Sequence, residues 1–335
     1  MNQIIDYTFY TILGVWEYYE NTGDKDFLKQ VQPILTEHLK YCTDRLSEKG
    51  FIVNEVKNGK INGWGVFVDW GELPRKDGEV SFVQILFWAA LQATAKIYGV
   101  LGLEYERILN FAETLRKRVD ETFWDEEKGV YFFARNDGVP DQTVTSHANA
   151  FALLYGFADE KKSKRIAENF VKGNVSLSIT PFMLEFTLAA LFEVGEKKKA
   201  LDMLQDYWGG MIDIGATTFW ETYQKGEREE VSTAMYGRPF GRSHCHIWGA
   251  GPLYLIPRYC FGIEPSLEFG EKYRVTPDVN LIEGSSIEIP LKRGTLKVGC
   301  ENGYLSVFSD EIDGEVVING KSFPICKGEK FYEKV

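Results

Sequence analysis

Cysteine is scarce in this 335-residue chain, and its spacing fits neither a disulfide framework nor a metal site. The five cysteines are scattered and odd in number, and no CxxC pair occurs among Cys42, Cys245, Cys260, Cys300 and Cys326. Isolated thiols of this kind are typical of a reducing compartment. We therefore expect a cytoplasmic protein, and we expect no metal centre built on these cysteines.

Positive charge and long apolar runs are also in short supply. The 38 Lys and Arg residues are outnumbered by 49 Asp and Glu residues, which gives a formal net charge of -11. Such a chain repels phosphate backbones and anionic lipid surfaces. No apolar run reaches the roughly 20 residues that are needed to cross a bilayer. We expect neither nucleic acid nor a membrane as its partner.

The N-terminal stretch lacks the features of a secretion signal. It has no basic leader and no small-residue cleavage site, and Asp6, Glu17 and Glu20 interrupt its apolar positions. We expect this stretch to form a helix of the mature protein.

Aromatic residues, by contrast, are abundant. They make up 14% of the chain, with 8 Trp and 17 Tyr. Their flat faces and polar rims suit the apolar faces and hydroxyls of sugars. Large helical cores use aromatic residues too, so composition alone does not identify a ligand.

Apolar residues recur with a helical period from residue 4 to about residue 262, and the helices come in pairs separated by short turns. Pairs without a fixed sequence repeat favour an α/α toroid over a solenoid. A closed toroid of six hairpins needs twelve helices and about nine are expected here, so we expect roughly three to be missing at the N-terminus. The expected helices span residues 4–21, 26–46, 81–98, 104–122, a segment from 146, 159–171, 181–194, 197–208 and 247–259.

The missing helices have a consequence for assembly. The apolar flanks of the helices at 4–19 and 247–259 are expected to be exposed or covered by another copy of the chain, which makes a homo-oligomer a candidate assembly.

The pattern changes near the C-terminus. Segments such as SSIEIPL, GTLKVGC, GYLSVFS and GEVVING alternate apolar with polar residues and are separated by glycine-containing turns. We expect a mainly α chain with an incomplete (α/α)6 toroid over residues 1–263 and a small antiparallel β-sandwich over residues 264–335. Within the toroid, the stretch at 128–142 predicts a β-hairpin that turns at Asn136 to Gly138.

Two long irregular stretches, residues 50–80 and 209–243, interrupt the helices. Loops of this length in a compact domain are usually functional or disordered, and the aromatic content here argues against disorder. The second contains GATTFWETYQKG, in which Glu221 stands between Trp220 and Tyr223. Aromatic neighbours limit solvent access, which suits a carboxylate that activates water, although a surface loop glutamate fits the residue type equally well.

Two histidines follow this loop, His244 and His246, on either side of Cys245. Ligands one residue apart, without an HExxH or CxxC pattern, give only weak support for zinc. We expect these histidines to donate hydrogen bonds to a sugar or to the carboxylate. His38 and His147 lie in helical pattern and are expected to be packed or helix-end residues.

The longest specific runs resemble a known family. WGGMIDIGATTFWETY (208–223) and SHCHIWGAGPLYLIPRYCFGI (243–263) resemble the paired signatures of the bacterial α-L-rhamnosidases, glycoside hydrolase family 78. YYENTGDKDFLKQVQPILTEHLKYC, FVDWGE and TPFMLEFTLAALFEVGE extend the similarity over essentially the whole chain.

The resemblance implies an (α/α)6 catalytic toroid with a C-terminal β-sandwich, and an inverting enzyme that releases terminal α-L-rhamnose or a related sugar without metal or cofactor. The glutamate of the family's TTxWE run falls on Glu221, the expected general base. The family's DW pair falls on Asp69 and Trp70, which are expected to bind the sugar. The histidine of the SHxHxW segment falls on His246 or His244. The expected aromatic wall includes Trp64, Trp220 and Trp248.

The family's general acid lies upstream, in an acidic segment with an RDE run, and this chain contains no such segment. An inverting glycosidase needs two carboxyl groups about 6.5 to 9.5 Å apart. Asp69 and Glu72 are the best local substitutes, although for Asp69 we favour a role in gripping sugar hydroxyls. The alternatives are a truncated chain, an acid supplied otherwise, a non-catalytic carbohydrate-binding fragment, or a toroid enzyme for another sugar, such as an unsaturated uronide or a glucoside.

Overall fold

The computed structural model describes residues 4–54, 56–57, 60–61, 65–70, 75–178 and 180–335. Its contacts divide the chain into two units. The first contains the chain up to Gly14 together with Lys29–Gly251, and the second contains Val15–Leu28 and Pro252–Val335. Helices α1 (Ile5–Thr22) and α2 (Lys25–Thr43) therefore contribute residues to both units.

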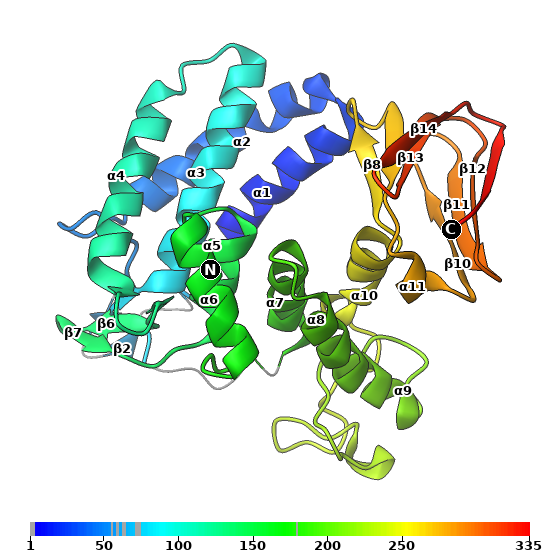
Figure 1. Cartoon of the computed structure of the whole chain (residues 1–335). Coiled ribbons are helices and arrows are strands. Elements are labelled where there is room, and N and C mark those ends of the chain that lie inside the picture. The colour runs from blue at the N-terminus through cyan, green and yellow to red at the C-terminus, as the bar shows by residue number, and fades with distance from the viewer. Residues whose placement is uncertain (1–3, 55, 58–59, 62–64, 71–74, 179) are drawn as a thin grey trace. The chain divides into compact units, whose positions relative to one another are not determined.

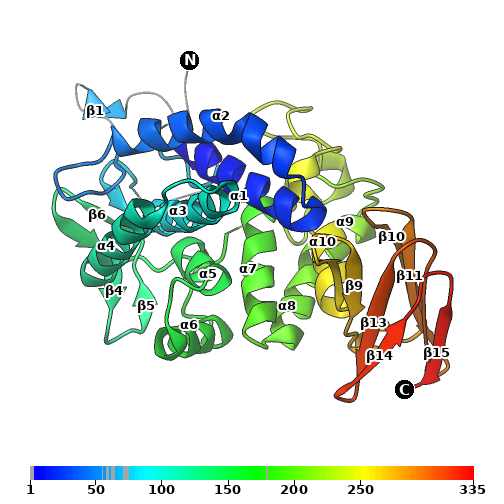
Figure 2. The same ribbon diagram turned by 90° about the horizontal axis from the view of Figure 1, so that it is seen from above.

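The first unit is built from helix pairs (Figures 1 and 2). Helix α3 packs against α4 and α5, α5 packs against α6 and α7, and α7 packs against α8. These pairs confirm the helical part of the sequence prediction. The helices are α3 (Ser81–Leu101), α4 (Glu106–Phe123), α5 (Ser146–Leu154), α6 (Glu160–Lys172), α7 (Pro181–Glu193) and α8 (Lys197–Leu204).

In each pair of consecutive helices, α3 with α4, α5 with α6 and α7 with α8, the first helix is more buried than the second. Most residues of α3, α5 and α7 are buried, whereas α6 buries only Ile166, Ala167 and Phe170 among its residues. A helix that is apolar all round belongs in a core, and an amphipathic one covers it. The ends are set by local chemistry. Asp159 caps the start of α6 by accepting a hydrogen bond from Lys162 N. After the last helical residue, Gly173 is the C-cap, and its φ of +76° favours a residue without a Cβ.

Two of the expected helices are interrupted. The segment predicted as one helix over 247–259 consists of a 3-10 turn (Ile247–Gly249), α10 (Pro252–Leu255) and a π-helical turn (Ile256–Cys260). The prediction of a continuous helix was wrong, because Gly249 and Gly251 weaken it and Pro252 lacks the backbone N–H that a helix interior requires. After α8 the chain continues through a π-helical turn (Gln205–Gly209) into α9 (Gly210–Asp213).

Short strands border the helices of the first unit. β6 (Ala134–Asn136) and β7 (Val139–Asp141) form the expected hairpin, and β6 also pairs with β3 (Glu79–Val80). At its tip Asp137 and Gly138 have φ values of +52° and +79°, as in a two-residue type I′ turn. The remaining short pairs are β1 (Val56–Lys57) with β2 (Lys60–Ile61) and β4 (Trp124–Asp125) with β5 (Val130–Tyr131).

The C-terminal part of the second unit holds two four-stranded sheets, in the orders β10-β11-β12-β15 and β14-β13-β9-β8. Pairing is antiparallel except between β13 and β9, which are parallel, so the expected purely antiparallel arrangement needs this correction. The strands are β8 (Ile263–Leu267), β9 (Lys272–Val275), β10 (Ser285–Pro290), β11 (Thr295–Glu301), β12 (Tyr304–Ser309), β13 (Asp313–Ile318), β14 (Lys321–Ile325) and β15 (Lys330–Lys334), with the short helix α11 (Val279–Ile282) between β9 and β10.

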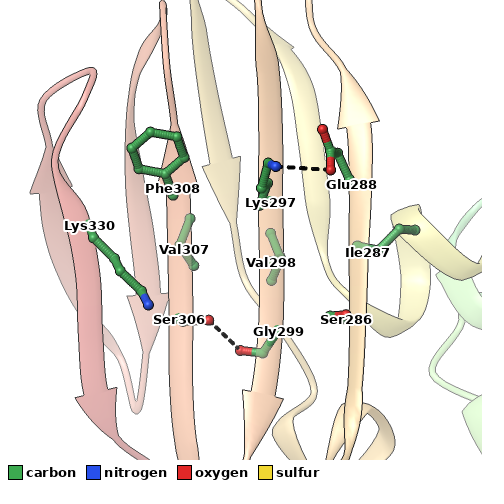
Figure 3. A pocket seen from close by; sticks show the side chains of 10 residues that line it. All are labelled: Ser286, Ile287, Glu288, Lys297, Val298, Gly299, Ser306, Val307, Phe308 and Lys330. Atoms are coloured by element: carbon green, nitrogen blue, oxygen red, sulfur yellow. Dashed lines mark hydrogen bonds and ion pairs between the residues drawn. The ribbon is translucent and has the colours of Figure 1, made fainter.

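Alternation along the strands separates the two faces of the sheet β10-β11-β12-β15. Leu296 and Val298 of β11 and Leu305 and Val307 of β12 are buried. The opposite face carries a shallow depression of about 380 Å³. Figure 3 shows its ion pair between Glu288 and Lys297 and its small residues, Ser286, Gly299 and Ser306.

Buried amide side chains hold short extended segments to the helices of the first unit. Gln84 of α3 accepts a hydrogen bond from Ile52 N at 2.9 Å and donates one to Ile52 O at 2.7 Å. Asn149 of α5 does the same for Tyr131, with both distances 2.9 Å. Each amide takes the place of a neighbouring strand, because buried backbone N–H and C=O groups need partners. No helix in the described part of the chain is long and apolar enough to cross a membrane.

Replacing Gln84 with leucine is expected to lower the free energy of unfolding by about 2–4 kcal/mol, because it leaves the backbone N–H and C=O of Ile52 buried without partners. Urea unfolding followed by circular dichroism measures the change. Gln92→Leu, at a half-buried position of the same helix, is the matched control, with an expected change below about 1 kcal/mol. Equal losses in the two variants would contradict the bracing role of Gln84.

Candidate functional site

Asp69 is enclosed by hydroxyl groups. Its side chain is almost completely buried, and Oδ2 accepts hydrogen bonds from Ser178 Oγ at 2.6 Å and Thr180 Oγ1 at 2.7 Å. His147 Nε2 lies 3.5 Å from the same oxygen. Thr180 is also the N-cap of α7, and His147 lies in the first turn of α5. Three segments that are distant in sequence therefore meet at one carboxylate.

These partners control the charge of Asp69. Burial alone would raise its pKa, but the nearby imidazole of His147 and the hydrogen bonds from Ser178 and Thr180 outweigh burial, and the pKa of Asp69 lies below its usual value. Asp69 is therefore ionised at neutral pH and has no proton to donate.

The backbone before Asp69 is strained. Asp69 N donates to Phe67 O at 2.8 Å across a three-residue turn, and the central residue, Val68, has a φ of +65°. A β-branched residue rarely adopts this conformation, and it persists only where the surroundings impose it. Asp6 of α1 imposes it here, since its Oδ2 accepts hydrogen bonds from Val68 N at 2.5 Å and Phe67 N at 3.1 Å.

The same turn is held from its other side. Lys76 Nζ donates to Phe67 O at 2.6 Å. Asp6 itself is fully buried, and burial raises its pKa from 3.8 to about 6 despite the hydrogen bonds from Val68 and Phe67. The support for Asp69 thus includes a carboxyl group that titrates near neutral pH.

Glu221 lies on a different pair of segments. Residues 218–221 and 243–246 run beside each other, joined by hydrogen bonds from Glu221 N to Ser243 O at 2.9 Å and from His246 N to Phe219 O at 2.8 Å. The half-buried Glu221 side chain accepts a hydrogen bond from Ser243 N through Oε2 at 3.0 Å. Its Oε1 lies 3.5 Å from the hydroxyl of Tyr236.

The two signature runs pack tightly around these segments. Trp208 Nε1 donates to Gly249 O at 2.7 Å. A Cβ on Gly249 would lie 2.5 Å from Trp220 O, so only glycine fits there. The buried ring of Trp220 stacks on His244, with ring centroids 4.1 Å apart and an angle of 7° between the planes. His244 is thereby fixed from both sides, because its Nε2 lies 2.9 Å from Ser232 O.

The other predicted aromatic and histidine residues lie close by. His246 contacts Trp248 edge to face at 5.9 Å between ring centroids, and Trp248 packs on Phe182 of α7 at 4.4 Å. Two of the predicted residues, Trp64 and Glu72, lie outside the described residues.

A groove of about 680 Å³ opens beside these groups. Trp70, which follows Asp69, and Thr222 and Tyr223, which follow Glu221, are among the residues that line it. Tyr207 of the π-helical turn and Ser178 line it too. In the part of the chain that the structure describes, the lining does not include Asp69, Glu221, His244 or His246. The groove is therefore lined by residues next in sequence to both predicted carboxylates, whereas the carboxylates themselves do not line it.

Sequence reasoning missed several residues of this region. Asp6, Ser178 and Thr180 shape the turn at Asp69, and Tyr236 faces Glu221. Ser178 and Thr180 contact a residue more than 100 positions away, at separations of 109 and 111. Among these residues of the described chain, only Tyr236 carried a local signal, the glycine of a tight turn that follows it. Within the described ranges, no cluster of three or more His, Cys, Asp or Glu side chains is arranged to hold a metal ion.

The buried carboxyl of Asp6 predicts a pH dependence of stability. Its folded-state pKa, about 6, lies above the unfolded value of 3.8. The stability that this group contributes is therefore full below pH 3.8 and is lost as the pH rises through 6. The loss amounts to roughly 3 kcal/mol, at about 1.4 kcal/mol per pKa unit.

Asp6→Asn keeps an oxygen acceptor and removes the titration. The unfolding free energy of the wild type, relative to this variant, is expected to fall by roughly 2.4 kcal/mol between pH 4 and pH 7, as measured by urea unfolding at each pH. Asp44→Asn, at an exposed carboxylate in the turn after α2, is the control and should give a flat difference. A flat difference for Asp6→Asn as well would refute the argument.

Comparison with known proteins agrees with this arrangement. The family model of the bacterial α-L-rhamnosidase six-hairpin glycosidase domain matches residues 1–260. No curated protein is significantly similar to the chain.

Solved structures share the fold. A family 78 rhamnosidase of Bacillus sp. GL1 aligns with a TM-score of 0.79 and 22% identity, over 94% of this chain and 33% of its own. A rhamnosidase from Klebsiella oxytoca with rhamnose bound aligns with a TM-score of 0.64 and 21% identity, over 76% of this chain and 47% of its own. The Streptomyces avermitilis α-L-rhamnosidase complexed with L-rhamnose aligns with a TM-score of 0.68 and 15% identity, over 95% of this chain and 32% of its own. The chain thus spans between a third and a half of the length of these proteins.

The match covers the first signature run, all but the last three residues of the second, and the turn at Asp69, and it confirms the resemblance found in the sequence. This chain belongs to the bacterial α-L-rhamnosidase six-hairpin glycosidase family.

Proposed function

We propose that this chain carries the general-base side of an inverting glycoside hydrolase site that releases terminal α-L-rhamnose or a related sugar, with Glu221 as the base. The observation that carries the proposal is the way Glu221 is held. A backbone N–H fixes Oε2, whereas in the part of the chain that the structure describes the hydrogen bonds of Oε1 comprise only the long contact to Tyr236. One oriented oxygen and one available oxygen suit a carboxylate that takes a proton from water.

For Asp69 we propose a positioning role, in place of the two roles weighed from the sequence, a substitute acid and a direct ligand of sugar hydroxyls. Its burial, its hydroxyl partners and its lowered pKa argue against proton donation. Its Oδ1 also accepts a hydrogen bond from Trp70 N at 2.7 Å. Asp69 therefore supports the placement of Trp70, whose ring offers the groove an apolar face for a sugar.

We also propose that the first unit belongs to an (α/α)6 toroid and that a separate C-terminal sandwich follows it. The alternation of buried α3, α5 and α7 with more exposed partners supports an (α/α)6 toroid, and the strands from Ile263 onward support a separate C-terminal sandwich. The boundary at 263/264, the cytoplasmic location and the homo-oligomer remain predictions. Exposed side chains at Tyr7, Ile247 and Leu253 support uncovered apolar flanks on the two expected segments.

The first test is Glu221→Gln, assayed on p-nitrophenyl α-L-rhamnoside. Turnover is expected to fall by about 10² to 10⁴-fold, because the attacking water loses its base. Glu230→Gln, at an exposed position of the same loop, is the matched control and should keep wild-type activity. An active Glu221→Gln variant would remove Glu221 from the reaction.

A second test compares leaving groups. A sugar alkoxide needs a proton to leave, whereas nitrophenolate is a far weaker base and leaves nearly unaided. If the chain supplies the base without the acid, it should turn over the nitrophenyl substrate and be slower on a rhamnosyl disaccharide by about 10² to 10⁴-fold. Similar rates on both would show that a working acid is present. Saturable rhamnose binding without any turnover would favour a carbohydrate-binding fragment.

A further inference from the structure

A tight hairpin stands next to Glu221. Met235 and Arg238 exchange both backbone hydrogen bonds, at 3.0 and 2.9 Å. Tyr236 and Gly237 between them have φ values of +53° and +70°. Reciprocal hydrogen bonds across two residues of positive φ define a type I′ turn. We call residues 232–242 the Tyr236 hairpin.

Tyrosine is a poor choice for the first position of this turn. Asn, Asp and Gly are the residues that take positive φ readily, and a bulky side chain there is an outlier. Packing does not explain it, because Tyr236 is 68% exposed. Strain that no burial offsets is a sign of a functional constraint on the side chain.

The phenol of Tyr236 is directed at the proposed base. Its hydroxyl donates to Glu221 Oε1, the oxygen that Ser243 N does not bind. Partial burial, and then the negative charge of Glu221, raise the pKa of Tyr236, so the hydroxyl keeps its proton. At 3.5 Å the contact is long. Contacts of this kind are often long in a free enzyme and shorten when substrate excludes water.

The hairpin is braced from its base. A buried ion pair joins Arg242 to Glu227 at 2.6 Å, and Arg242 N donates to Thr233 O at 3.0 Å. Gly241 passes so close to the hairpin that a Cβ would lie 2.2 Å from Met235 O. The turn is therefore carried on a fixed support, which allows its tip to hold a side chain in one place.

We propose that Tyr236 is a positioning residue for Glu221: it orients Oε1 toward the attacking water and stabilises the carboxylate until the proton is taken. This inference rests on the proposed role of Glu221 as the base. It adds a residue from the loop after the TTFWE run, outside both signature runs.

Three variants test it on p-nitrophenyl α-L-rhamnoside. Tyr236→Phe removes only the hydroxyl. Gly237→Ala leaves the Tyr236 side chain intact but strains the backbone of the turn. The added Cβ would meet no atom within 4 Å, so a steric clash would not contribute to its effect. Gly138→Ala is the matched control, because Gly138 occupies the same turn position in the β6–β7 hairpin, with a φ of +79° and the same open surroundings.

Tyr236→Phe is expected to lower kcat by about three- to tenfold with less than about a twofold change in KM, because the lost hydrogen bond acts on the reaction more than on binding. The acidic limb of the pH dependence of kcat should move to higher pH, since a donor to a carboxylate favours its ionised form. Gly237→Ala should act in the same direction. Gly138→Ala should leave kcat and the acidic limb unchanged.

The outcomes separate the two proposals. If Glu221→Gln is inactive while Tyr236→Phe keeps wild-type kcat and an unmoved acidic limb, Tyr236 has no positioning role and the base assignment stands. If Glu221→Gln is active, or the wild type shows no turnover, the base assignment fails and this inference fails with it. A fall in kcat for Gly138→Ala equal to that of Gly237→Ala would trace the effect to general loss of structure and overturn the inference. Thermal unfolding of each variant checks that it is folded.

Discussion

The arrangement of the first unit depends on placing the charge of Asp69 in its interior. An ionised carboxylate that leaves water needs partners for its lone pairs, or it becomes neutral. The hydroxyls of Ser178 and Thr180 supply them, and His147 adds a third polar neighbour. Because Thr180 also begins α7, the start of that helix and the loop at Asp69 are fixed by the same contacts.

Two carboxylates of the region therefore have opposite surroundings. Asp69 has hydrogen bonds to both oxygens and almost no exposure, whereas Glu221 is half-buried with one oxygen held by the backbone. A carboxylate whose oxygens are fully occupied can hold neighbouring groups in place but cannot take a proton from water. Different environments on similar groups are a general means of dividing roles within one site. This difference in environment supports the proposal that Glu221, and not Asp69, is the base.

The sequence predicted the parts of this chain that depend on local pattern. The periods of α3, α4 and α6, and the turn of the β6–β7 hairpin, are visible in neighbouring residues. Gly251 and Pro252, in the middle of the helix expected at 247–259, are local signals of its interruption. The prediction gave more weight to the helical spacing of the apolar residues.

Contacts between distant segments were not predictable in this way. The parallel pairing of β13 with β9 is set by the order of strands in the sheet, which alternation along one strand does not encode. The partners of Asp69 lie 109 and 111 residues away. The DW pair identified the position of Asp69 through its family resemblance, but its buried, ionised state follows from contacts with Ser178, Thr180 and His147 that no motif links to it.

A residue with strained backbone lies beside each of the two carboxylates. Val68 and Tyr236 both have positive φ, and neither has a side chain that favours it. Each lies beside one of the two carboxylates, Val68 before Asp69 in the chain and Tyr236 at the oxygen of Glu221. Backbone of this kind would relax unless other contacts held it, and here Asp6 holds the first while the ion pair of Arg242 braces the hairpin that carries the second. Helix α1, through Asp6, thus fixes the turn before Asp69, whereas the hairpin beside Glu221 is held by contacts within its own loop.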